Sequence, residues 1–170
     1  MPWFKTQEPL KITGRRVLTM TEYFYEDLKV GDKIVTRTRY ITGSEVEVIT
    51  ALTGITNPLF QDTEEARRRG FEGKITPGAV ISAYAFGLEY QTGIYDNIIA
   101  LVEVDEMRFK APLKHGDPLR SELEVIYKRE TSRPERGLVV FQRRCYVREK
   151  MIMEAKLKFL YLRRAGGASD

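Results

Sequence analysis

The chain is poor in the residues that bind transition metals or form disulfides. Cys145 is its one cysteine and His115 its one histidine. A single cysteine excludes a disulfide within the chain and is typical of the reducing cytoplasm, where we expect the protein to be. With only these two side chains, a zinc site of the usual nitrogen and sulfur ligands is not expected, so we predict no metal and no bound cofactor.

Long hydrophobic runs and concentrated charge are also missing. The longest apolar runs, GLVVF and IIALV, are too short to cross a bilayer, and the N-terminus MPWFKTQEPL lacks the apolar core of a secretory leader. The net charge is only +4, and basic residues are scattered except at Arg67, Arg68 and Arg69. Because these basic residues are not interleaved with stacking aromatics, we expect neither a nucleic-acid partner nor a membrane partner.

What remains has the composition of one globular domain. Hydrophobic residues make up 42% and charged residues 31% of the 170 residues, enough for a single substantial core. Residues 1–22 contain prolines and no sustained period, which predicts an irregular extension. We therefore expect a single domain over 23–165 and a flexible tail over 166–170.

Short elements are predicted in the first half of the domain. Residues 33–41 alternate between apolar and polar, as in a half-buried strand. Ser44 and Glu47 then form a plausible capping box for a short helix that ends at Gly54. A second short helix begins after Asp62, a good N-cap, with Glu65 three residues later and a stop at Gly70.

The second half predicts one buried helix and a large sheet. After Pro77 and Gly78, residues 79–93 are apolar on nearly all sides, so this helix must be buried. Four segments with β alternation follow, at 98–110, 118–130, 137–149 and 151–164. This order indicates an α+β fold in which a curved antiparallel sheet wraps a long central helix. Such a sheet leaves an edge and an apolar helix face to cover, which favours self-association.

Four sequence blocks resemble a known family. They are YFYEDLKVGDKI at 23–34, TGITNPLFQDTEEA at 53–66, KITPGAV at 74–80 and MRFKAPLKHGDPLRSELEV at 107–125. Their order and spacing are similar to those of the MaoC-like hydratases and dehydratases of the hotdog-fold superfamily. The resemblance implies a hotdog fold, pairing of two such units, and binding of acyl or enoyl groups on a thioester carrier, usually coenzyme A.

The resemblance also implies a site. In active members an Asp and a His hold the water that adds to an enoyl thioester, and a backbone N–H at the start of the central helix polarises the carbonyl. A helix N-terminus is suited to this role because it offers free donors and a favourable dipole. Gly78 matches the position of that donor, and the neighbouring Thr76 and Pro77 are further candidates for the substrate site.

The acid and base of the family are replaced in this chain. The family motif reads Gly, Asp, any residue, Asn, Pro, any residue, His; here the Asp falls at Ile55 and the His at Phe60. Neither side chain can transfer a proton, so hydration by the family mechanism should be absent from the chain alone. Asn57 matches the motif; we expect it to shape the turn, with a substrate contact as the second interpretation.

Other polar residues are candidates for a displaced site. Glu72 precedes the central helix, and Glu89 lies within it, where we favour a carboxylate in water over a buried one with a raised pKa. His115 is expected in a surface turn. For the others we favour structural roles: a helix cap for Asp62, a solvated face for Glu64 and Glu65, and packing with a hydrogen-bonding tip for Tyr84 and Tyr90. For Arg67–Arg69 we also favour a solvated helix face, with contact to carrier phosphates as the second interpretation.

Three functional hypotheses follow. In the first, the chain is a non-catalytic or supporting subunit of an (R)-specific enoyl-CoA hydratase or dehydratase, beside a hotdog chain that keeps the acid and base. In the second, it is a hotdog thioesterase with a displaced carboxylate. In the third, it is a non-catalytic acyl-CoA-binding or scaffold protein that forms homo-oligomers. The sequence leaves open whether the chain is itself an enzyme.

Overall fold

The structure, a computed structural model, describes residues 22–164. The predicted extension, apart from Glu22, and the predicted tail lie outside these residues. The elements in chain order are η1 (Tyr25–Asp27), β1 (Lys33–Val35), β2 (Arg39–Tyr40), α1 (Gly43–Thr53), α2 (Pro58–Gln61), α3 (Thr63–Arg68), α4 (Gly78–Tyr90), β3 (Ile98–Phe109), β4 (Pro118–Glu130), β5 (Arg136–Val147) and β6 (Lys150–Leu162).

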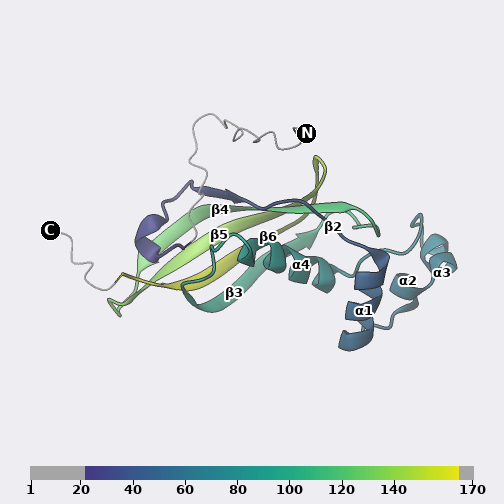
Figure 1. The fold of residues 1–170 in the computed structure, drawn as a ribbon, viewed down its shortest axis with the longest axis horizontal. Helices are drawn as coiled ribbons and strands as arrows, with labels where there is room; N and C mark the ends of the chain where they lie inside the picture. Colours follow the sequence, from purple (N-terminus) through teal and green to yellow (C-terminus); the bar gives the residue numbers. More distant parts are fainter. Residues whose placement is uncertain (1–21, 165–170) are drawn as a thin grey trace, which may run out of the picture.

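An antiparallel sheet with α4 along one face forms the body of the molecule, and α1, α2 and α3 lie together at one end (Figure 1). The strand order is β1-β4-β5-β6-β3, with β2 also paired to β4. The predicted α+β class is therefore confirmed, and the four long strands lie within two residues of their predicted limits. No helix in residues 22–164 is long and apolar enough to span a membrane.

The predicted continuous strand over 33–41 is wrong, because β1 and β2 are separate. Thr36, at the break, is buried, and its hydroxyl accepts a hydrogen bond from the backbone N–H of Ser121 at 2.9 Å. The same hydroxyl donates to the carbonyl of Arg37 at 2.9 Å. A side chain therefore supplies a bond at the point where the backbone ladder is interrupted, an alternative that Ser and Thr offer to regular pairing.

The predicted cap of the first helix is also wrong by two residues. Helix α1 is capped by Thr42 and Glu45: the Glu45 N–H donates to the Thr42 hydroxyl, and the Glu45 carboxylate accepts from the Thr42 N–H at 3.0 Å. The bonds that the Thr42 N–H, the Thr42 hydroxyl and Arg39 donate to the Glu45 carboxylate lower its pKa to about 2. Thr42 satisfies the same spacing rule as the predicted Ser44, so the rule alone does not choose between them. The predicted end at Gly54 is confirmed, with φ of 70°.

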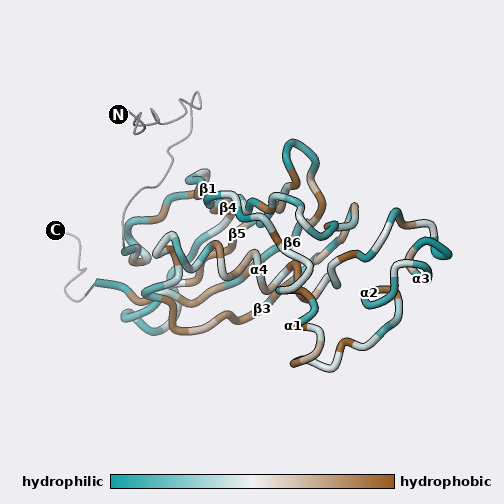
Figure 2. Tube along the Cα trace, turned by 45° about the vertical axis from the view of Figure 1, so that its right-hand side comes forward, coloured by the Kyte–Doolittle hydropathy of each residue, from teal (hydrophilic) through white to brown (hydrophobic). Residues whose placement is uncertain are grey.

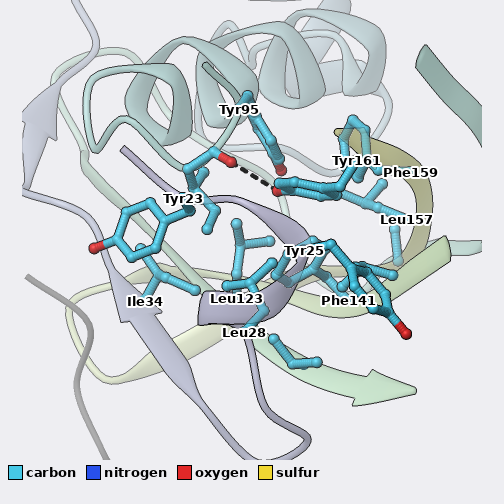
Figure 3. Close-up of a cluster of buried hydrophobic side chains, with 14 residues drawn as sticks. Tyr23, Tyr25, Leu28, Ile34, Tyr95, Leu123, Phe141, Leu157, Phe159 and Tyr161 are labelled. Atoms are coloured by element: carbon cyan, nitrogen blue, oxygen red, sulfur yellow. Dashed lines mark hydrogen bonds between the residues drawn. The ribbon is translucent and has the colours of Figure 1, made fainter. Parts of the chain in front are cut away.

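Two buried clusters make up the core. The larger is rich in aromatic rings, including Tyr95, Phe141 and Phe159 (Figure 3). Two of its tyrosine hydroxyls have partners: that of Tyr161 donates to the carbonyl of Ile94 at 2.7 Å, and that of Tyr95 to the Glu89 carboxylate at 2.9 Å. The second cluster lies beneath α4 and includes Val80, Leu88 and the side chain of Cys145. Together they fix α4 on the sheet.

One side of α4 and the whole of β3 remain uncovered. Ala79, Ala83 and Tyr90 form an exposed stripe on α4, so the predicted burial on all sides is not found in the single chain. Strand β3 is an edge of the sheet, and every residue of it after Ile98 is exposed. The tube of this strand is partly coloured as hydrophobic in Figure 2. Its exposed large apolar residues are Ile99, Leu101, Val102, Val104, Met107 and Phe109.

Candidate functional site

A pocket of about 390 Å³ opens at the start of α4. We call it the Gly78 pocket; it is lined by Leu59, Phe60, Phe71, Ile75, Thr76, Gly78, Ile81, Phe109, Lys110, Ala111 and Pro112. Most of these side chains are apolar. Lys110 is the one ionisable side chain among these lining residues, and its ammonium pairs with the Glu154 carboxylate at 2.9 Å. The pocket therefore suits an apolar chain better than a charged one.

Gly78 begins α4 and lines this pocket, while Pro77 is the N-cap residue and makes no side-chain capping bond. Backbone N–H groups of the first helical turn have no partner within the helix. A Cβ at position 78 would lie 2.7 Å from Cζ of Phe109, so a larger residue there would displace this partly exposed ring. This close approach gives Gly78 a packing role that is independent of any ligand.

Thr76 lies two residues before the helix and is one of the lining residues of the pocket. Its side chain is 3% exposed, and its hydroxyl has no hydrogen-bond partner within the described part of the chain. The Thr76 N–H is satisfied, because it donates to the carbonyl of Leu113 at 2.8 Å. A buried hydroxyl without a partner costs free energy, which a ligand that hydrogen-bonds to it would recover.

The two replaced motif positions have apolar surroundings. Phe60 lies in α2 and lines the Gly78 pocket, so a histidine at this position would face the same space. Ile55 is half-buried and packs against the core cluster beneath α4. An unpaired carboxylate there would be partly removed from water, at a cost in free energy.

The remaining motif residues build the local turn. The Asn57 side chain caps α2, accepting from the Leu59 N–H at 3.0 Å, and Pro58 occupies the first position of that helix. The predicted turn role of Asn57 is confirmed by this bond. Asp62 likewise accepts from the Glu65 N–H at 2.9 Å, so its predicted capping role is confirmed. Helix α2 itself was not predicted, although proline directly after asparagine signals such a start.

Glu72 and His115 lie together in a second pocket, not at Gly78. Glu72 is exposed, and its carboxylate accepts from the Lys114 ammonium at 2.5 Å, which lowers its pKa. His115 does lie in a turn, as predicted, but it is half-buried rather than on the surface. Burial, and then the charge of Lys74, lower the pKa of His115. Neither residue lines the Gly78 pocket.

Glu89 is fully buried, so the predicted carboxylate in water is wrong. Arg143 of β5 pairs with it, with Nη2 at 2.5 Å and Nε at 2.8 Å from the two carboxylate oxygens. The Ser121 hydroxyl donates at 2.5 Å and the Tyr95 hydroxyl at 2.9 Å. These four bonds compensate the burial of a charge. The alternation along β5 could have indicated that Arg143 is buried, because it lies midway between Phe141 and Cys145 on the inward face of the strand.

The other candidate residues make ion pairs or packing contacts outside the Gly78 pocket. Arg67, Arg68 and Arg69 pair with Glu64 and Glu65 on the solvated face of α3, as predicted. Tyr84 is buried, but its hydroxyl has no partner among the described residues, so the expected hydrogen bond of its tip is not found. Tyr90 is exposed and packs edge-on against Tyr95.

Comparison with known proteins identifies a matching family and a sequence relative. Residues 27–140 match the MaoC like domain. Over 120 residues the chain is 28% identical to the mitochondrial 3-hydroxyacyl-[acyl-carrier-protein] dehydratase of Arabidopsis thaliana, covering 70% of this chain and 68% of that protein.

Two solved structures share the fold. The (R)-hydratase of A. caviae involved in PHA biosynthesis matches with a TM-score of 0.67 and 24% identity, over 81% of this chain and 98% of its own. A conserved hypothetical protein of Mycobacterium tuberculosis with a double hotdog fold matches with a TM-score of 0.79 and 16% identity, over 88% of this chain and 47% of its own. The fold is a hotdog, as predicted, and the chain belongs to the MaoC-like domain family.

Proposed function

We propose that this chain binds acyl or enoyl thioesters in the Gly78 pocket and does not hydrate them alone. It then acts as the supporting chain of a hydratase or dehydratase, beside a hotdog chain that keeps the acid and base. The observation that carries the proposal is the composition of the pocket. Phe60 faces it where the family motif has histidine, and its described lining residues include no carboxyl or imidazole group.

The polar groups in the pocket wall suit a thioester carbonyl. Gly78, whose N–H has no partner within the helix, and Thr76, whose buried hydroxyl has none among the described residues, lie two positions apart and line the same pocket. A helix N-terminus favours partial negative charge on a bound oxygen. The carbonyl would bind at these donors, with its acyl chain against Phe60, Phe71 and Ile81.

A second hotdog chain would cover the apolar surface that this chain leaves exposed. The edge strand β3 offers unpaired backbone groups and a row of exposed apolar side chains, and α4 leaves the stripe of Ala79, Ala83 and Tyr90 uncovered. The double hotdog protein of Mycobacterium tuberculosis has room for two such units, since this chain matches 47% of it. The partner would be a second copy or a different hotdog chain.

Loss of the enoyl absorbance of crotonyl-CoA tests the catalytic half of the proposal. We expect no hydration above background by the purified chain, but binding of crotonyl-CoA by calorimetry. Phe60→His combined with Ile55→Asp should restore measurable turnover, because position 60 faces the pocket. Thermal unfolding of the variant controls for the cost of a carboxylate at position 55. Turnover by the unaltered chain would contradict the proposal, and so would absence of thioester binding.

A further inference from the structure

A pocket of about 500 Å³ adjoins the Gly78 pocket, with which it shares Phe71, Ile75 and Pro112. Its chemistry is different. Lys74, Lys114, His115 and Glu72 contribute polar side chains to its wall. We call it the His115 pocket. A ligand that fills both pockets would have an apolar part and a polar, charged part.

The two lysines of this pocket form weak ion pairs that a ligand could replace. The Lys114 ammonium pairs with Glu72, whose side chain is 83% exposed, and the Lys74 ammonium pairs at 3.0 Å with Glu47, which is 58% exposed. Ion pairs with such exposed carboxylates contribute little to stability, because solvent screens both charges. An anionic group that reaches both lysines would therefore displace the carboxylates at small cost.

His115 offers a third contact. Its Nε2 is buried and has no hydrogen-bond partner in residues 22–164. Because burial lowers its pKa, the imidazole is neutral near pH 7 and adds no charge of its own. One nitrogen of a neutral imidazole carries a proton, and this N–H donates well to a phosphate oxygen.

We infer that the His115 pocket binds the phosphate-bearing arm of the thioester carrier, with Lys74 and Lys114 on its oxygens. This inference rests on the proposed function, since the acyl end of the same ligand would occupy the Gly78 pocket. Each phosphate of such an arm carries one negative charge and two terminal oxygens, and these oxygens can accept from two ammonium groups and one ring N–H. Free coenzyme A and the phosphopantetheine arm of a carrier protein share this chemistry.

Three crotonyl thioesters separate the contributions of the two pockets: those of pantetheine, coenzyme A and a phosphopantetheine-bearing acyl carrier protein. We expect the coenzyme A thioester to bind the purified chain about tenfold more tightly than the pantetheine thioester, which has no phosphate. Lys114→Gln should remove most of this difference. Glu72→Gln should increase it, because it frees the ammonium of Lys114. Comparing the carrier-protein thioester with the coenzyme A thioester shows which source of phosphate binds better.

Lys158→Gln is the matched control. Lys158 also pairs with an exposed glutamate, Glu103, but on the sheet and outside the pocket wall. This variant should bind all three thioesters as the unaltered chain does. Thermal unfolding of each variant shows that it is folded.

The outcomes separate this inference from the proposed function. Equal binding of the pantetheine and coenzyme A thioesters would overturn the phosphate site and leave the acyl site standing. No difference between Lys114→Gln and Lys158→Gln would overturn it as well. Binding of pyrophosphate that is lost in Lys114→Gln, without binding of any thioester, would support the phosphate site and refute the proposed function.

Discussion

The buried ion pair of Glu89 and Arg143 gives the sharpest stability prediction. Both side chains are 0% exposed. Glu89→Ala removes the carboxylate and leaves the guanidinium with the Ser82 hydroxyl at 3.3 Å and the ring of Phe86 at 3.8 Å. Breaking one side of a buried pair typically costs about 3–5 kcal/mol, because the other charge is left uncompensated.

For a domain of this size, that loss corresponds to a fall of roughly 6–20 °C in the unfolding midpoint. The assay is urea and thermal unfolding of the purified variant. Glu89→Leu combined with Arg143→Leu should cost less than Glu89→Ala alone, because no charge is left behind. Part of the loss should remain, since the Ser121 and Tyr95 hydroxyls also lose their partner.

Glu64→Ala is the matched control for an ion pair in water. Glu64 and its partner Arg67 are both exposed, so the unfolding midpoint should change little. If Glu89→Ala were as mild as Glu64→Ala, the reasoning about desolvation would be wrong. If the double variant were less stable than Glu89→Ala, the uncompensated charge would not be the cause of the loss.

Three further predictions concern single side chains. The pKa of His115 is lowered in the folded state, so the unfolded state binds more protons. Stability should therefore fall as the pH drops below the unfolded pKa of about 6.5. The free energy of unfolding should differ less between pH 7.5 and pH 5.5 in His115→Gln than in the unaltered chain. Burial raises the pKa of Cys145 to about 12, so iodoacetamide at pH 8 should label it only in urea, as mass spectrometry would show. Thr76→Val should leave stability unchanged or raise it, since the hydroxyl has no described partner. The variant should bind crotonyl-CoA about 2–10-fold more weakly, as measured by calorimetry. Equal binding would show that Thr76 is not part of the site.

The long strands and the central helix were predictable because their signal is periodic. Alternation over a dozen residues identifies a strand whatever it pairs with, and β4 has the predicted limits. The short elements depend on single side chains. Thr36 divides a predicted strand through its bond to Ser121, a residue distant in sequence, and no local pattern announces that partner.

Part of the candidate pocket could be expected from the sequence. The family resemblance singled out Phe60, Thr76 and Gly78, and all three line one pocket, whereas Ile55, Asn57 and Pro77 are not among its lining residues. The pairing of Glu89 with Arg143 was missed because an acidic residue near a helix end suggests water. The second pocket was missed because Lys74 and Lys114 are separated by α4 and β3 in the sequence.

Phe109 belongs to two surfaces at once: it ends the exposed edge strand β3, and its ring lies against Gly78 in the pocket wall. A chain that pairs along β3 would restrict this ring and so change the space available to a ligand. By thermodynamic linkage, a ligand that needs the ring moved must alter the affinity between the chains by the same factor. We therefore expect ligand binding in the pocket and pairing along β3 to be coupled through one side chain, so that ligand affinities measured at different protein concentrations should differ.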